Sequence, residues 1–316
     1  MVPEDFEKWA RICEHIIMHY NEGWADGFYY NIEYWEIWNE PDLNEDDAEN
    51  KLTWGGTKKQ FFSFYDIVAN YLKKRFPELK IGGPASCGNL AWMEDFLAQL
   101  NAPLDFFSFH MYAYEPRNMV EYAATVKNLL IKYGFGKVET ILNEWNYVKN
   151  WQNRGEYVTA IHGMTGAAYA AATMCAMQNS GYVDMLMYYD ARLYTPWNGL
   201  FDFYTGETLN TYHVMWAFGQ LYRLGKQVVC QNDDDDLIIT GATDGDTCAA
   251  MLAYYTPEAA CEKTVILNTG LAEPMTCYLL DETCDMTPIG NVKDGDRLIV
   301  KPNTVLYFTS AGAQIG

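Results

Sequence analysis

The feature that most constrains the fold is an alternation of short apolar strands with amphipathic helices from residue 1 to about residue 226. Strands are predicted over 34–38, 79–82, 105–109, 139–142 and 184–188, and helices over 4–20, 57–76 and 206–225. The segment 156–180 is rich in Ala, Met and Gly and is predicted to be one buried helix. This alternation indicates βα units, which build a parallel sheet covered by helices.

The five predicted strands are fewer than the eight that close a (β/α)8 barrel, which takes about 250 residues. We therefore expect an α/β fold, a TIM barrel that is incomplete at its N-terminal side and occupies residues 1–226. Three strand–helix units are missing from this count. We expect the sequence to be a fragment whose first strands lie upstream.

The pattern changes after residue 226. Short β-runs are predicted over 237–240, 249–254, 264–268, 277–280, 298–300 and 305–308. Asp-Gly turns stand at Asp244-Gly245 and Asp294-Gly295. These features predict a second domain over residues 227–316, folded as an antiparallel β-sandwich.

The charge of the chain narrows its partners. Forty-two acidic and 22 basic residues give a formal charge of −20, which repels nucleic acid and anionic membrane surfaces. No stretch approaches the roughly 20 consecutive apolar residues of a membrane span. We expect a soluble protein with a neutral substrate and with neither nucleic acid nor membrane as a partner. The sequence leaves the compartment, cytoplasmic or secreted, and the oligomeric state open.

The 8 cysteines lack the spacing of zinc ligands, so we expect no metal and no cofactor. Several of them fall after residue 226, which suits either disulfides in an exported protein or thiols in a cytosolic one. These late cysteines are Cys230, Cys248, Cys261, Cys277 and Cys284.

Two glutamates stand at the ends of predicted strands, in Trp38-Asn39-Glu40-Pro41 and Leu142-Asn143-Glu144-Trp145. In a parallel barrel the carboxyl ends of the strands line the active face, so both carboxylates should converge. Either one alone is as consistent with a solvated loop carboxylate or a helix N-cap partner as with a catalytic role. Together they match glycoside hydrolysis, which needs two carboxyl groups about 5–5.5 Å apart in retaining enzymes.

The segment 34–43 resembles the fourth-strand motif of clan A glycoside hydrolases, in which Asn-Glu-Pro holds the acid/base. The resemblance is closest to glycoside hydrolase family 39, the family of β-xylosidases and α-L-iduronidases. Phe107–Tyr112 is similar to its sixth strand, Glu144-Trp145-Asn146 to its seventh, and Tyr188-Tyr189-Asp190 with Trp197 to its eighth. The resemblance implies that barrel strands four to eight are present.

The resemblance also implies site residues, with Glu40 as acid/base and Glu144 as nucleophile. Asn39 can donate its amide to the sugar 2-hydroxyl. His110 can bond the acid/base or a sugar hydroxyl, and Tyr112 can donate to the nucleophile. Three aromatic residues are expected to contact the sugar: Trp145, Tyr189 and Trp197.

The function expected from these residues is retaining, β-xylosidase-like hydrolysis of a glycoside or oligosaccharide by double displacement. Other clan A enzymes, namely arabinofuranosidases and endo-acting xylanases or mannanases, share both glutamates and stay open as alternatives. Because three strands are missing, an inactive carbohydrate-binding fragment is a further alternative.

Overall fold

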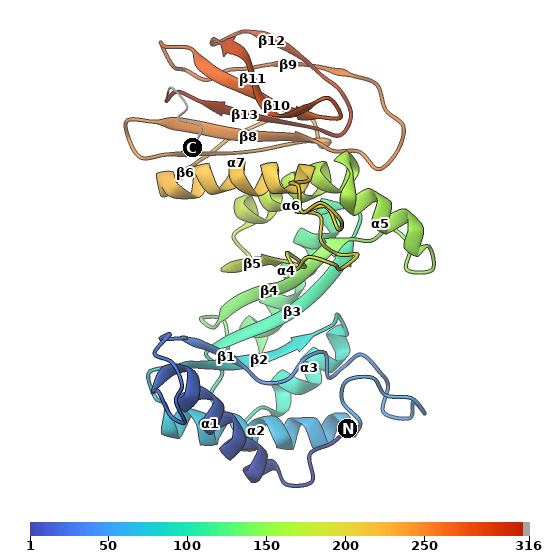
Figure 1. Cartoon of the computed structure of the whole chain (residues 1–316), viewed down its shortest axis with the longest axis vertical. Helices are drawn as coiled ribbons and strands as arrows, with labels where there is room; N and C mark the ends of the chain where they lie inside the picture. Colours follow the sequence, from blue (N-terminus) through green and yellow to red (C-terminus); the bar gives the residue numbers. More distant parts are fainter. Residues whose placement is uncertain (312–316) are drawn as a thin grey trace. The chain divides into compact units, whose positions relative to one another are not determined.

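The computed structural model describes residues 1–311, and Figure 1 labels its helices and strands. Contacts divide the chain into two compact units. Unit 1 holds residues 1–111, 122–144 and 182–187, and unit 2 holds 112–121, 145–181 and the residues from 188 on. Strands β3 (Phe106–Ala113) and β4 (Glu139–Tyr147) therefore begin in unit 1 and end in unit 2.

Five strands form one sheet in the order β1-β2-β3-β4-β5. The other three are β1 (Tyr34–Glu36), β2 (Lys80–Ser86) and β5 (Met185–Tyr188). Strand β1 runs parallel to β2, and β2 runs parallel to β3. All five predicted strands are confirmed, and β2, β3 and β4 extend further at their carboxyl ends than the sequence predicted.

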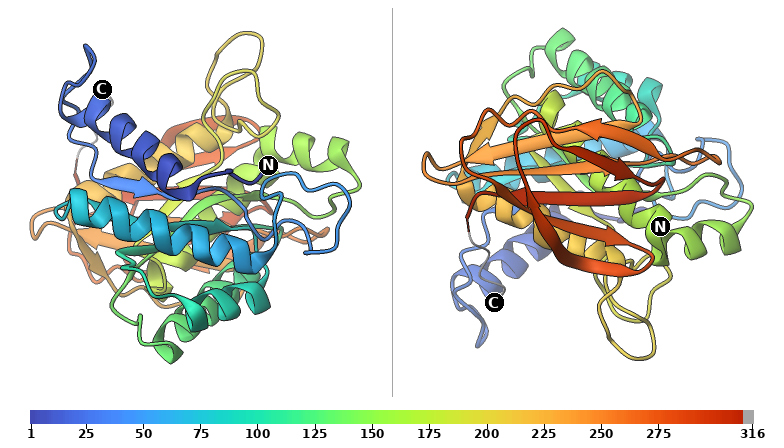
Figure 2. Two further views of the ribbon diagram at one scale, coloured as in Figure 1. Left: turned by 90° about the horizontal axis from the view of Figure 1, so that it is seen from below. Right: turned by 90° about the horizontal axis from the view of Figure 1, so that it is seen from above.

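The helices of unit 1 include α1 (Phe6–Asn21), α2 (Lys58–Arg75) and α3 (Leu90–Gln99), while α4 (Pro116–Lys132) begins in unit 2 and ends in unit 1. Helix α2 begins at a capping box in which the Thr57 side chain accepts from the Gln60 backbone and Gln60 reaches back to Thr57. Basic residues fill its last turn, where they favour the helix dipole. Helices α1 and α2 lie side by side (Figure 2).

Unit 2 contains α5 (Arg154–His162), α6 (Met164–Ser180) and α7 (Asn210–Leu224). Its six-stranded antiparallel sheet has the order β11-β10-β13-β8-β7-β6, and β12 pairs with β9 in a two-stranded sheet. The bounds are β6 (Lys226–Val228), β7 (Leu237–Thr243), β8 (Cys248–Tyr254), β9 (Lys263–Ile266), β10 (Met275–Asp281), β11 (Cys284–Val292), β12 (Arg297–Val300) and β13 (Thr304–Thr309). Helices α6 and α7 pack together against β7 and β8 (Figure 1).

The single helix predicted over 156–180 is wrong, because Gly163 separates α5 from α6. Gly163 has extended backbone dihedrals and precedes α6 directly. The chain then passes so close to α5 that a Cβ on Gly166 would lie 2.4 Å from the carbonyl oxygen of Ala160. The break was hidden in the sequence because α6 is buried on almost every side and therefore has no polar face to mark its start.

Strands β6 and β11 were not predicted. Most of β11 is exposed, so its apolar residues do not alternate clearly with polar ones. It lies at the edge of the sheet and contains Pro288, which an edge strand tolerates. The six other strands predicted after residue 226 are confirmed.

Apolar side chains from the six-stranded sheet and from the β9–β12 pair share one core in unit 2. Its members include Tyr254, Cys277, Val300 and Phe308, all 1% exposed or less. The eight cysteines all lie within the described residues and are free thiols, so no disulfide supports this core. Among the described residues, none of the helices combines the length and apolar character needed to cross a membrane.

Candidate active site

The turn that carries Glu40 follows β1 and has a strained backbone. Trp38 and Glu40 have φ angles of 74° and 48°, in the left-handed region that side chains other than glycine seldom adopt. The turn is fixed to β2, since Ile37 N donates to Gly82 O at 2.9 Å and Glu40 N donates to Ala85 O at 2.9 Å. Residues in such conformations cost about 1–3 kcal/mol each and gather at functional sites.

Packing around Trp38 and Asp42 holds this turn in place. The Trp38 ring contacts Trp54 and Phe64, with ring centroids 5.2 and 5.6 Å apart. Asp42 is buried, and its carboxylate accepts from Ser86 Oγ at 2.5 Å and from Cys87 N at 2.8 Å. Both flanks of Glu40 are therefore anchored within unit 1.

Glu40, His110 and Glu144 come together in unit 1. His110, on β3, is 2% exposed, and its Nδ1 lies 2.8 Å from Glu40 Oε1 and 3.5 Å from Glu144 Oε2. One oxygen of each carboxylate and one ring nitrogen of His110 all lie within 4.8 Å of one another. The imidazole thus contacts two carboxylates whose residues are far apart in sequence. Both glutamate side chains keep some exposure, 18% and 20%.

A third carboxylate lies close to this trio. Glu36, the last residue of β1, accepts from Asn143 Nδ2 at 2.9 Å and 3.1 Å through its two oxygens. Glu36 is exposed as a whole residue, but desolvation of its carboxyl raises its pKa, while hydrogen bonds from Ser108 and Asn143 and the charge of His110 oppose that rise. Because Asn143 immediately precedes Glu144, Glu36 fixes the backbone neighbour of the second glutamate.

Predicted aromatic residues gather in unit 2. The Tyr112 ring contacts Trp197 and Trp151, with centroids 5.1 and 5.2 Å apart. Tyr157 stacks on Trp197 at 5.1 Å, and Tyr189 lies 6.3 Å from Trp197. Trp151 keeps 55% of its surface exposed. We call these five residues the aromatic cluster.

Trp145 is not part of the aromatic cluster, although a sugar contact was expected for it. It is 1% exposed and packs against Tyr188, with ring centroids 5.4 Å apart. An indole buried in this way belongs to the core and is not open to a ligand. Asn39, in contrast, is exposed beside Glu40.

The loop after β5 is held by two polar side chains. Asn146 is buried and donates from Nδ2 to the carbonyl oxygens of Tyr189 at 2.6 Å and Trp197 at 3.0 Å. Asp190 is also buried and accepts from Arg192 Nη2 and from Thr195 Oγ1, both at 2.7 Å. These bonds order the part of the loop that carries Tyr189 and Trp197.

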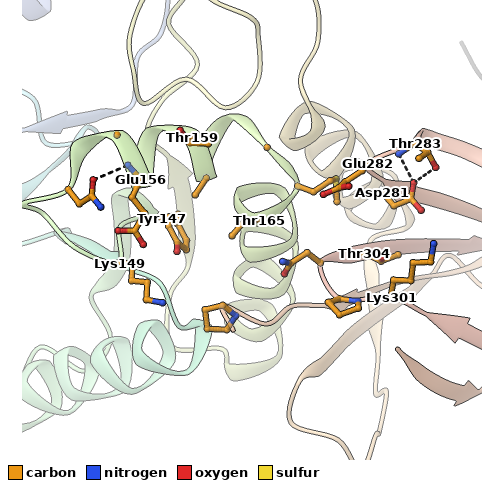
Figure 3. Close-up of a pocket in the computed structure, with 18 of the residues that line it drawn as sticks. Tyr147, Lys149, Glu156, Thr159, Thr165, Asp281, Glu282, Thr283, Lys301 and Thr304 are labelled. Carbon is orange, nitrogen blue, oxygen red and sulfur yellow. Dashed lines mark hydrogen bonds between the residues drawn. The ribbon is translucent and has the colours of Figure 1, made fainter. Parts of the chain in front are cut away.

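Unit 2 also contains an open cleft of about 1140 Å³ (Figure 3). Its lining is mixed in charge, since it includes Lys149 and Lys301 as well as Glu156 and Glu282. Its lining residues include no member of the Glu40–His110–Glu144 trio. This mixture of charges gives no preference for one class of ligand.

Glu40, His110 and Glu144 also lie close enough together to bind a metal ion, and no other group of His, Cys, Asp or Glu side chains in the described part of the chain does so. Two carboxylates and one imidazole are ligands that several divalent metals accept. The same three groups suit acid–base chemistry. The geometry therefore permits either a cation or proton transfer.

Sequence reasoning found the trio but missed the groups that support it. Glu36 was assigned only to a strand, and neither Asp190 nor Trp151 was singled out. Asp190 offered a signal, because it stands two positions after the end of a predicted strand and is followed two positions later by Arg192. Trp151 offered none, since its neighbours Tyr112 and Trp197 come from distant segments.

The sequence profile of Glycosyl hydrolases family 39 matches residues 2–175. A β-xylosidase of Geobacillus stearothermophilus is 25% identical over 288 residues, which cover 79% of this chain and 52% of that enzyme. The chain therefore spans about half the length of this relative.

Two solved structures share the fold. A glucosidase from Croceicoccus marinus superposes with a TM-score of 0.76 at 21% identity, covering 98% of this chain and 75% of that one. A family 39 β-xylosidase from Caulobacter crescentus gives a TM-score of 0.71 at 19% identity, covering 96% and 72%. At these identities the likeness concerns the fold alone.

Proposed function

This chain belongs to glycosyl hydrolases family 39, and from that premise we propose that it carries the catalytic carboxylates of a retaining, β-xylosidase-like glycoside hydrolase. The proposal rests on one observation, the convergence of Glu40 and Glu144 on His110. An oxygen of each carboxylate lies within 4.8 Å of the other. Retaining enzymes separate their carboxyl groups by about 5–5.5 Å, whereas inverting ones need about 6.5–9.5 Å to admit water.

The proposed reaction proceeds by two displacements. Glu144 attacks the anomeric carbon while Glu40 gives its proton to the glycosidic oxygen, so the leaving alcohol departs and a glycosyl ester forms on Glu144. Glu40, now a carboxylate, takes a proton from water, and that water breaks the ester. Both glutamates return to their starting states, and the configuration of the sugar is retained.

The surrounding residues have proposed roles of their own. His110 positions the Glu40 carboxyl through its Nδ1, 2.8 Å away. Asn39 donates its amide to the 2-hydroxyl, a bond that strengthens in the transition state. Tyr112 donates to Glu144, while Tyr189 and Trp197 bind the sugar through their ring faces.

The architecture is part of the proposal. The strands β1 to β5 act as strands four to eight of a (β/α)8 barrel, whose carboxyl ends carry the catalytic groups. Residues 227–316 form an accessory β-sandwich. Glycosides or oligosaccharides are the proposed substrates.

Two variants of the full-length gene product test the assignment. Glu144→Ala should abolish hydrolysis of every aryl β-xyloside, because no nucleophile is left. Glu40→Ala should retain turnover of activated aryl groups, which leave without protonation, and added azide should accelerate it by attacking the glycosyl ester. Equal losses that azide does not rescue would show that the roles are wrong.

Treatment with a chelator distinguishes acid–base catalysis by the trio from catalysis by a bound metal ion. If Glu40, His110 and Glu144 transfer protons, EDTA leaves the rate of the wild-type protein unchanged. A loss of activity that a divalent metal restores would replace the carboxylate mechanism with a metal-dependent one.

A further inference from the structure

Three aromatic rings are exposed together on the long loop that follows β5, in unit 2. Tyr194 is 69% exposed, Phe203 39% and Tyr204 89%. The ring centroids of Tyr194 and Phe203 are 5.3 Å apart, and those of Phe203 and Tyr204 are 4.9 Å apart. The three rings, which we call the Tyr194 platform, thus form one continuous surface. Contiguous exposed apolar groups of this kind mark interaction sites.

The platform stands on an ordered hairpin. Phe201 bridges Thr208 in antiparallel fashion at its base. Within the turn, Asp202 Oδ1 accepts from Tyr204 N at 2.9 Å and from Thr205 N at 2.8 Å. These bonds fix the backbone of Tyr204, so its exposed ring is presented from a defined position.

Tyr194 reaches the platform at a conformational cost. Its φ angle is 68°, in the left-handed region that a bulky side chain rarely adopts. The following residue, Thr195, is anchored by its hydroxyl, which donates to the buried Asp190 at 2.7 Å. Backbone strain of this kind persists where the surroundings enforce it, often at ligand sites.

The charge of this region favours a neutral ligand. The chain carries a formal charge of −20, and Asp202 and Glu207 lie in the same hairpin. The guanidinium of Arg192 is already committed to Asp190, with Nε 2.9 Å and Nη2 2.7 Å from Oδ2. A neutral molecule with apolar faces and many hydroxyl groups, as in a chain of pyranose rings, matches exposed tyrosine and phenylalanine rings.

The platform is continuous along the chain with residues of the proposed sugar site, because the same loop carries Tyr189 and Trp197. We propose that the Tyr194 platform binds a neutral polysaccharide through its three exposed rings. This step rests on the proposed function for the identity of the polysaccharide, a xylan. Its binding, however, requires no catalysis.

Affinity electrophoresis in gels that contain neutral arabinoxylan tests the platform. The full-length gene product with Glu144→Gln is used so that the polymer is not degraded. Tyr194→Ala and Tyr204→Ala should each raise the apparent dissociation constant roughly tenfold, the loss expected for one stacking ring. Tyr222→Ala is the matched control, because Tyr222 is 82% exposed on α7 and should bind arabinoxylan unchanged. Melting temperatures of all variants check that folding is preserved.

Several results would overturn the platform. One is that arabinoxylan does not retard the Glu144→Gln parent. Another is that it retards Tyr194→Ala and Tyr204→Ala as much as the parent. A third is that Tyr222→Ala loses as much affinity for arabinoxylan as the two platform variants. Self-association that Tyr204→Ala abolishes, with polymer binding unchanged, would identify a subunit interface instead. Failure of the proposed function would give another result. A protein that binds arabinoxylan but cleaves no aryl xyloside would support the platform and contradict only the proposed hydrolysis.

Discussion

At the scale of single residues, His110 connects the two glutamates. It is almost fully buried, and its Nδ1 lies within hydrogen-bond distance of Glu40. A buried imidazole needs partners for its ring nitrogens, since an unpaired polar group in the interior costs about 1–3 kcal/mol. The carboxylate of Glu40 satisfies this need and is held in one orientation in return.

His110→Phe should therefore lower kcat about tenfold to a hundredfold, because Glu40 loses the group that orients it. The loss should be largest for poor leaving groups, which depend on protonation by Glu40, and small for dinitrophenyl xyloside. His110→Asn, which keeps a donor near the Nδ1 position, should recover part of the rate. A loss that is the same for every leaving group would mean that His110 does not act through Glu40.

The surroundings of Glu36 make its contribution to the stability of the protein depend on pH. Desolvation of its carboxyl raises its pKa above the usual value of 4.5, although the residue as a whole is exposed. The folded protein therefore binds this proton more tightly than the unfolded chain, by an amount that the nearby solvent reduces. The contribution of protonated Glu36 to the stability of the fold is fully present below the pKa of Glu36 in the unfolded chain. It is lost as the pH rises through the pKa of Glu36 in the folded protein.

Glu36→Gln cannot ionise but keeps an acceptor oxygen for Asn143. At pH 7 it should melt at a higher temperature than the wild type, and the difference should shrink as the pH approaches 4. Calorimetric melts of both proteins across this range measure the effect. A difference that is constant with pH would show that ionisation of Glu36 does not affect stability.

At the scale of elements, the loop after β5 depends on β4 for its order. Asn146 on β4 supplies both amide protons to carbonyl groups of the loop, at Tyr189 and Trp197. Asp190 adds charge-assisted bonds within the loop itself. The aromatic cluster is therefore positioned by polar groups that do not belong to it.

Asn146→Ala should lower the free energy of unfolding by about 1–3 kcal/mol, because the partly buried carbonyl groups of Tyr189 and Trp197 each lose a hydrogen bond. It should also raise KM more than it lowers kcat, since Tyr189 and Trp197 are proposed to bind the sugar and not to react. Urea unfolding and steady-state kinetics measure the two effects. Asp5→Ala, which removes the N-cap of α1, is the control, with about 1 kcal/mol of destabilisation and unchanged KM. If both variants change KM equally, the loop bonds have no special role in binding.

At the scale of the whole molecule, β1 and β5 are the outer strands of the five-stranded sheet. Each presents backbone donors and acceptors that a closed barrel would pair. Burying each Val, Leu or Ile that a closed barrel covers is worth about 1.5–3 kcal/mol, a large share of the roughly 5–15 kcal/mol by which domains are stable.

Residues 1–316 produced alone should therefore self-associate or aggregate and lack measurable glycosidase activity. Light scattering and aryl xyloside assays test this expectation, and joining three further strand–helix units should give an active protein that does not associate through these edges. A monomer of 36.2 kDa that melts cooperatively and cleaves aryl xylosides would show instead that the five-stranded sheet is a viable fold.

The sequence by itself determined most of the order of strands and helices, and it singled out the two glutamates that the structure brings together. Strand and helix periods are local properties, so the βα units and most strands after residue 226 were predictable. The Asn-Glu-Pro motif marked Glu40, and the matching position at a strand end marked Glu144. Prediction failed in segments where apolar and polar residues do not alternate clearly, namely at the α5–α6 break and in the exposed strand β11.

Only the tertiary structure decided which side chains meet. Trp145 and Trp151 are equally aromatic in the sequence, yet one is buried in the core and the other lies open in the aromatic cluster. Glu36 and Asn143 are more than a hundred residues apart and bond only because their strands lie in one sheet. Burial and hydrogen bonding depend on neighbours that are distant in the chain, and no local pattern encodes those neighbours.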